Sequence, residues 1–157
     1  ATERYLAVQS FNPEVDSVSV ALVDEQLPPN RLQVVDLETG EQTTVTERPV
    51  VAFFWSPARD RLLMIEAEGE IGDLVLSVWD EGTMRDGPTF RVAAQWFGEF
   101  LPFYDQYAQS MSLWAPDGGA YAFVGMYEEQ RGVFVADLAD DSVTRISSGS
   151  WVAWSPS

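Results

Sequence analysis

The sequence contains no histidine, no cysteine and no lysine, and each absence removes a class of chemistry. Without histidine there is no imidazole general base, no Ser-His-Asp or Cys-His pair and no imidazole metal ligand. Without cysteine there are no disulfides, thiol nucleophiles or thiolate metal sites. Without lysine there is no Schiff base and no phosphate-binding lysine of the Walker type. The chemistry that remains is that of carboxylates, hydroxyls, tyrosine and arginine.

Positive charge and long apolar runs are also scarce. Nine arginines stand against 25 acidic residues, which gives a net charge of −16 at pH 7. Such a field repels phosphate backbones and anionic lipids, so we expect no nucleic-acid partner. The longest apolar runs, such as residues 50–55 and 120–126, fall short of the roughly 20 residues that cross a bilayer, so no membrane insertion is expected. This acidic, lysine-free composition favours an extracytoplasmic protein of the periplasm, cell envelope or secreted fraction, although a GC-rich genome would also favour arginine over lysine.

Aromatic residues are plentiful, and they mark an internal repeat. An aromatic residue, one intervening residue and a proline recur at intervals of 44, 59 and 40 residues, beginning at Phe11, Trp55, Trp114 and Trp154. An apolar strand that ends in aspartate follows the first three of these, ending at Asp36, Asp80 and Asp137. The distance from aromatic residue to aspartate is 25, 25 and 23 residues, so two separate markers keep one register.

Each repeat unit is typical of four short β-strands separated by turns. In the clearest unit the strands are expected at residues 109–115, 120–127, 132–138 and 142–147, with a Pro-Asp-Gly-Gly turn after the first. Proline presets φ in such a turn and glycine accepts positive φ. Near-continuous apolar strands indicate burial on both faces, as in stacked blades. The aspartates Asp36 and Asp137 are expected to accept hydrogen bonds from amides of the following turn.

Two segments match a known repeat closely: Trp114-Ala-Pro-Asp-Gly118 and Val133-Phe-Val-Ala-Asp-Leu138. Here the chain resembles the TolB-like, WD-type β-propeller repeat, whose blades carry a Trp-Ser-Pro-Asp-Gly turn and then a strand close to Ile-Trp-Val-x-Asp-Leu. Residues 55–59 match more loosely and residues 11–14 are degenerate. The resemblance implies an all-β fold of antiparallel, four-stranded blades. It says little about function, because such repeats occur in envelope proteins, peptidase propeller domains and many other proteins.

We therefore predict a single β-propeller segment over residues 1–157. Its parts are expected to be blades at about 3–48, 49–96 and 109–149, an insertion at about 97–108, and the lone first strand of a further blade at 150–157. Closed propellers generally have at least about four blades. About three blades would leave a strand edge exposed, so we expect either an excerpt of a longer propeller or a ring completed by self-association or by a second chain.

The insertion between the second and third blades is the candidate contact surface. The distance from the strand-ending aspartate to the aromatic residue of the next aromatic-x-Pro marker is 34 residues there, against 19 and 17 elsewhere. In a propeller such a link opens on the same side as the turns between second and third strands, which are acidic here at residues 24–25, 66–70 and 127–129. The candidate partner-binding residues are Trp96, Phe97, Phe100, Phe103, Tyr104, Asp105 and Tyr107 in the insertion, and Glu66, Glu68, Glu70, Glu128 and Glu129 in the turns.

Two interpretations of these residues stay open. In one they recognise a cationic or aromatic partner, or bind Ca²⁺ through carboxylate oxygens. In the other the aromatic residues fill the missing part of the ring and the acids form a solvated face. Three further tryptophans, Trp79, Trp151 and Trp154, are expected to pack between blades.

The functional prediction is a non-enzymatic, protein-binding or scaffolding propeller segment, with no catalytic residues, no resident metal and no cofactor. The alternative is the propeller domain of an enzyme. That would be either a substrate-gating domain of a peptidase or a carbohydrate-active propeller whose paired carboxylates come from Glu66, Glu68, Glu70 and Asp105.

Overall fold

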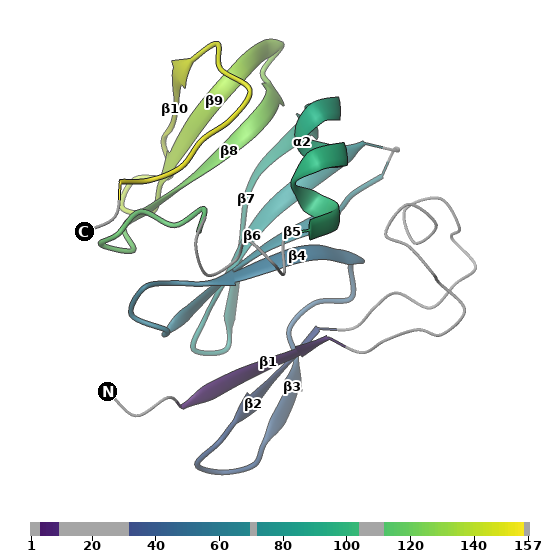
Figure 1. The fold of residues 1–157 in the computed structure, drawn as a ribbon. Coiled ribbons are helices and arrows are strands. Elements are labelled where there is room, and N and C mark those ends of the chain that lie inside the picture. The colour runs from purple at the N-terminus through teal and green to yellow at the C-terminus, as the bar shows by residue number, and fades with distance from the viewer. Residues whose placement is uncertain (1–3, 10–31, 70–71, 104–111, 156–157) are drawn as a thin grey trace.

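The computed structural model describes residues 4–9, 32–69, 72–103 and 112–155, and most of its regular structure is antiparallel β-sheet (Figure 1). A three-stranded sheet has the order β1-β2-β3, with β1 (Tyr5–Gln9), β2 (Leu32–Asp36) and β3 (Gln42–Thr44). A seven-stranded sheet has the order β10-β9-β8-β7-β6-β5-β4. Its strands are β4 (Val50–Trp55), β5 (Arg61–Ala67), β6 (Asp73–Asp80), β7 (Thr83–Val92), β8 (Ala120–Tyr127), β9 (Gln130–Asp137) and β10 (Val143–Ser147). A short helix, α2 (Ala94–Glu99), and a 3-10 turn, η1 (Leu101–Phe103), follow β7.

Strands β4 to β7 form one complete four-stranded blade, the second blade, in which each strand pairs antiparallel with the next. The side chains of β5 and β6 are buried on both faces. Leu62 and Met64 lie in a cluster with Leu32 of the first sheet, whereas Leu63 lies in a cluster with Phe123 of β8. The second blade is therefore packed between two other layers, which explains the lack of apolar and polar alternation in its central strands.

Strands β8 to β10 form the third blade, and several details agree with the sequence prediction. Strand β8 covers the predicted range of 120–127 and is largely buried. The predicted turn is present: the amide of Gly118 donates to the carbonyl of Ala115 at 2.9 Å, and Gly118 has a positive φ of +72°. The carboxylate of Asp137 accepts from the amide of Ala139 at 2.8 Å, as expected. The described part of the first strand, residues 112–115, makes one isolated β-bridge, Trp114 to Tyr121, rather than a continuous strand.

The first sheet differs from the prediction. Tyr5 pairs with Asp36, just as Arg61 pairs with Asp80 and Ala120 pairs with Asp137. Strand β1 therefore has the register of the second strand of a blade, whereas the position of Phe11, by analogy with Trp114 in the strand expected at 109–115, suggests a first strand.

The aspartate marker itself was placed correctly, because the carboxylate of Asp36 accepts from the amides of Glu38 and Thr39 at 2.8 and 3.2 Å. The 22 residues between β1 and β2, residues 10–31, lie outside the described part of the chain, so the marker at Phe11 cannot be compared directly with the strand pairing. Strand pairing, not the distance along the chain, defines the position of a strand in a blade.

Two indole groups link successive repeat units. The Nε1 of Trp114 donates to the carbonyl oxygen of Phe54 at 2.9 Å, and the Nε1 of Trp154 donates to that of Leu113 at 2.8 Å. In each case the acceptor immediately precedes the tryptophan of the preceding unit, Trp55 or Trp114. The repeat in the sequence thus corresponds to a repeated contact between the starts of neighbouring units.

Candidate functional site

The described residues that follow β7, α2 and η1, begin at one end of the blades, next to two of the acidic turns (Figure 1). The amide of Val92, at the end of β7, donates to the carbonyl of Gly72 at 3.1 Å, and Val92 is paired with Gly125 of β8. These contacts bring the start of α2 close to the β5–β6 turn and to the β8–β9 turn. We call this region the α2 end; it consists of α2, η1, Glu68, Glu128 and Glu129.

Two of the predicted contact residues are buried in the core instead. Trp96 is 1% exposed and Phe100 is 2% exposed. Their rings stack on each other with centroids 5.2 Å apart, and Phe100 also stacks on Phe54 of β4 at 6.3 Å. Residues four apart share one face of a helix, so α2 is held by this aromatic face. The burial supports the packing interpretation for Trp96 and Phe100, and neither ring is available to a partner in this structure.

Three other aromatic residues in or beside α2 and η1 are at least partly exposed to solvent. Phe103 is 46% exposed, and Phe97 is partly buried against the core. Trp151 was predicted to pack between blades but is 42% exposed, with its ring edge-on to Phe100 at 5.7 Å. Of the acidic candidates, Glu128 and Glu129 are exposed and Glu68 is partly exposed. Glu66 is 0% exposed, so its side chain does not reach the surface. Four candidates lie outside the described residues: Glu70, Tyr104, Asp105 and Tyr107.

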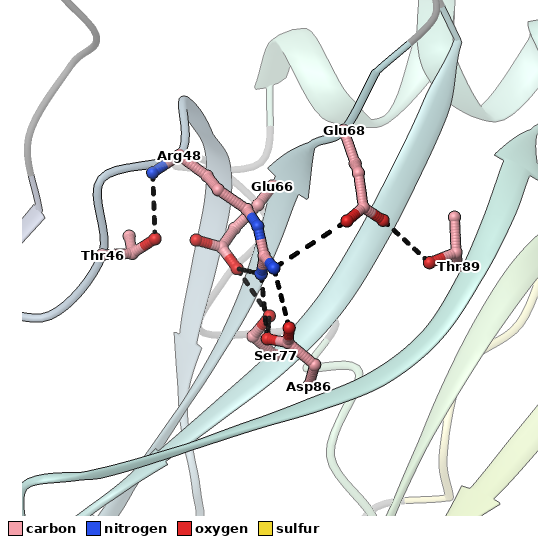
Figure 2. Close-up of polar contacts among 7 residues, drawn as sticks. All are labelled: Thr46, Arg48, Glu66, Glu68, Ser77, Asp86 and Thr89. Carbon is pink, nitrogen blue, oxygen red and sulfur yellow. Dashed lines mark hydrogen bonds and ion pairs between the residues drawn. The ribbon is translucent and has the colours of Figure 1, made fainter.

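A polar cluster that the sequence did not reveal lies across the second blade (Figure 2). We call it the Arg48 cluster; its members are Arg48, Glu66, Glu68, Ser77, Asp86 and Thr89. Arg48 comes from the β3–β4 connection, where its amide donates to the hydroxyl of Thr46 at 3.1 Å. Its guanidinium donates through Nη1 and Nη2 to the two oxygens of Asp86, on β7, at 2.8 and 2.7 Å. This paired geometry is the strong form of an arginine–carboxylate contact.

Glu66 is the buried member of the cluster, with 0% exposure. Its Oε2 accepts from the hydroxyl of Ser77 at 2.5 Å and lies 3.4 Å from Nη1 of Arg48. Its Oε1 has no hydrogen-bond partner among the described residues. Ser77 is also fully buried, and its hydroxyl lies 3.1 Å from Asp86. A buried carboxylate is costly unless it is paired, so Arg48 and Ser77 stabilise Glu66 at this position.

The other contacts of Arg48 add to the ion pairs that join the β3–β4 connection to the sheet. Its Nη2 lies 3.8 Å from Glu68, which in turn accepts from the hydroxyl of Thr89 at 2.9 Å (Figure 2). The hydrogen bonds from Arg48 lower the pKa of Asp86 below its ordinary value of 3.8, and the neighbouring acids raise the pKa of Arg48. The cluster is thus a network of ion pairs that keeps Asp86 charged.

The described residues carry neither a metal centre nor a membrane-spanning helix by the usual criteria. Within residues 4–9, 32–69, 72–103 and 112–155, no group of three or more His, Cys, Asp or Glu side chains is arranged to hold a metal ion. In the same part of the chain, no helix has the length and hydropathy needed to cross a bilayer.

Comparison with known proteins confirms the fold class. No family model matches the chain, and no curated protein gives a significant match. Among solved structures, TolB from Acinetobacter baumannii is 16% identical with a TM-score of 0.54, over 95% of this chain and 32% of TolB. An oligogalacturonate lyase in complex with manganese is 12% identical with a TM-score of 0.55, over 93% of this chain and 34% of the lyase.

Both structures are β-propellers, so the chain is an all-β protein built of antiparallel propeller blades. The TolB-like resemblance in the sequence is supported at the level of the fold. The chain spans about a third of the length of each of these two proteins. At such low identity the likeness concerns the fold, because propellers with similar blades carry unrelated functions.

Proposed function

We propose that the chain is a non-enzymatic, protein-binding or scaffolding segment of a β-propeller, and that the α2 end is its contact surface. The observation that supports this most directly is Phe103, a large aromatic side chain that is 46% exposed. Phe103 ends the turn η1, where its amide donates to the carbonyl of Phe100 at 3.0 Å, and Phe100 and Trp96 are buried in the core. Exposed aromatic residues on a rigid base are typical centres of protein interfaces.

The acidic residues of the α2 end suggest the chemistry of the proposed partner. Glu68, Glu128 and Glu129 belong to the turns beside α2, and Glu99 at the end of α2 is exposed. The whole chain has a net charge of −16. A partner surface with arginine or lysine side chains around an apolar centre complements this region, and such complementarity mainly raises the association rate and the specificity.

The enzymatic alternative receives less support from the geometry. Paired-carboxylate catalysis needs one carboxyl group held as an acid and both groups facing a sugar. Glu66 is fully buried beneath Ser77 and Arg48, and Asp86 is held by two hydrogen bonds from Arg48. We therefore assign these carboxylates a structural role. Hydrolysis or elimination on a panel of glycosides and polyuronides that disappears in Glu66→Gln, with the fold retained, would overturn this assignment.

The binding proposal is tested by capture from a cell-envelope extract of the source organism. Wild type is compared with Phe103→Ala and with Leu37→Ala, a matched control because Leu37 is 54% exposed and follows β2 of the first sheet. We expect the same proteins on wild type and on Leu37→Ala, their loss on Phe103→Ala, and their elution at about 0.5–1 M salt, where surface charges are screened. Identical capture by all three chains would refute the α2 end as the contact surface.

Two further parts of the proposal concern context. An extracytoplasmic location is supported by the acidic, lysine-free composition, and fractionation of source cells tests it directly. Self-association, or a second chain, is proposed to complete the propeller, because the described residues provide about three blades and closed propellers generally have about four to eight.

A further inference from the structure

Among the described residues, no strand pairs with the outer edge of β1 in the first sheet, and the repeat defines which strand fits there. In the second blade β4 pairs with β5, with Trp55 opposite Leu62. In the third blade Trp114 is bridged to Tyr121. The register of β1 makes Leu6 the equivalent of Leu62 and Tyr121. Because β1 is an edge strand in the order β1-β2-β3, its outer edge matches a first strand whose tryptophan lies opposite Leu6.

The apolar side chains that β1 exposes suggest that another part of a complete propeller covers them. Leu6 is 50% exposed and Val8 is 41% exposed. The equivalent residues of the second blade, Leu62 and Met64, are both 0% exposed. An edge strand with exposed apolar side chains is a template for pairing with another strand.

The chain itself carries a first strand of the required kind near residue 154. Trp154 makes the same indole hydrogen bond to the preceding unit as Trp114 does, at 2.8 and 2.9 Å. Trp154 is followed by Ser and Pro, as is Trp55. Residues 150–154 thus stand at the start of a further blade, and within the described residues no strand pairs with them.

We propose that residues 150–154 of one copy pair antiparallel with β1 of a second copy, with Trp154 opposite Leu6 and Val152 opposite Val8. This inference rests on the proposed completion of the propeller by self-association and names the strands and the register. About three blades from each of two copies give about six blades, within the range of about four to eight seen in closed rings. Two equivalent exchanges close the ring, so association stops at a dimer.

The first test is the mass of the purified chain in solution by light scattering. We expect a dimer, with twice the 17.5 kDa of the single chain. The double variant Leu6→Lys/Val8→Lys should be a folded monomer, because both positions are half exposed and two charges there oppose strand docking. Ile146→Lys is the matched control: Ile146 is 60% exposed on β10, which is neither of the two strands of the proposed pair, and this variant should remain a dimer.

The second test determines the register of the strand pair by disulfide cross-linking. The chain has no cysteine, so Ala7→Cys/Ala153→Cys introduces the only thiols, at positions that the proposed register places directly opposite each other. Mild oxidation should give a covalent dimer, whereas Leu6→Cys/Ala153→Cys, shifted by one residue onto the other face, should cross-link poorly.

A wild type that stays monomeric at millimolar concentration would overturn both the strand exchange and self-association. A dimer that survives Leu6→Lys/Val8→Lys and is not trapped through residues 7 and 153 would overturn the exchange while leaving self-association standing. Neither result bears on capture at the α2 end, which is measured separately.

Discussion

A Cβ atom on Gly125 would lie 2.5 Å from the carbonyl oxygen of Arg91, closer than real Cβ atoms approach backbone oxygens. Phe90 would be almost as close, with its Cδ2 atom at 2.6 Å. This contact lies where β7 of the second blade pairs with β8 of the third, at only two residue pairs. The absence of a side chain at residue 125 therefore allows the two blades to join.

Gly125→Ala is expected to destabilise the fold by about 1–3 kcal/mol, because the neighbouring atoms are backbone and a packed ring that cannot move aside easily. Gly98→Ala is the matched control: Gly98 lies in α2 and an added Cβ would meet nothing within 4 Å. That substitution should be neutral or stabilise by up to about 1 kcal/mol, since it reduces the entropy of the unfolded chain. Urea unfolding measures both, and equal midpoints for the two variants would contradict the proposed role of Gly125.

The indole hydrogen bonds between units give a second prediction. Trp114→Phe removes the donor to the buried carbonyl of Phe54 and is expected to cost about 1–3 kcal/mol, with some lost packing in addition. Trp154→Phe removes the same kind of contact at a partly buried site, where water replaces the donor more easily, so its cost should be smaller. Thermal unfolding of the two variants checks the order. A larger loss for Trp154→Phe would show that burial does not control the strength of these contacts.

Much of the fold could be predicted because two separate markers depend on local chemistry. The aspartates at the ends of β2 and β9 accept amide hydrogen bonds in the next turn, and the Trp-x-Pro tryptophans bind a backbone carbonyl of the preceding unit. Both roles require particular residue types, so they leave a readable pattern. In the first unit the Phe11 marker does not indicate the register of β1, because the pairing of Tyr5 with Asp36 is a long-range property that spacing along the chain does not show.

The candidate site was harder to predict for a physical reason. Trp96, Phe100 and Phe103 stand close together in one aromatic segment, and nothing in the sequence separates the rings that pack on Phe54 and Phe90 from the ring that faces solvent. The Arg48 cluster joins residues 38 positions apart through three strands and a connection, so no local motif marks it. Burial and strand pairing decide these roles, and both depend on the assembled sheet.

The division of the aromatic segment into core and surface can be tested by stability. Trp96→Ala is expected to cost about 3–5 kcal/mol, because a fully buried indole leaves a large cavity. Phe103→Ala should change stability by less than about 0.5 kcal/mol, as for most exposed positions. Chemical denaturation measures both. A large loss for Phe103→Ala would place its ring in the core and remove it from the proposed contact surface.

The Arg48 cluster predicts a specific dependence of stability on pH. Arg48 lowers the pKa of Asp86 in the folded state below the ordinary value of 3.8. A carboxyl group with a lowered pKa stabilises the fold fully above its unfolded pKa, and this contribution is lost as the pH falls through the folded pKa. Arg48→Met removes the cause of the shift. The variant should therefore be less stable than wild type at pH 6, by about 1–2 kcal/mol for a partly exposed pair, and should lose less stability between pH 6 and pH 3.

Asp86→Asn is the matched variant, because it leaves Arg48 in place beside Glu66 and Glu68 but removes the titrating group. Other aspartates with lowered pKa values, Asp36, Asp60 and Asp140, make the same contribution to the acid sensitivity of every variant, so the difference from wild type isolates Asp86. The free energy of unfolding is measured by urea titration at pH 6 and at pH 3. If wild type, Arg48→Met and Asp86→Asn lose the same amount between the two pH values, the ion pair does not hold Asp86 charged, and the cluster must stabilise the blade through the buried contacts of Glu66 and Ser77 alone.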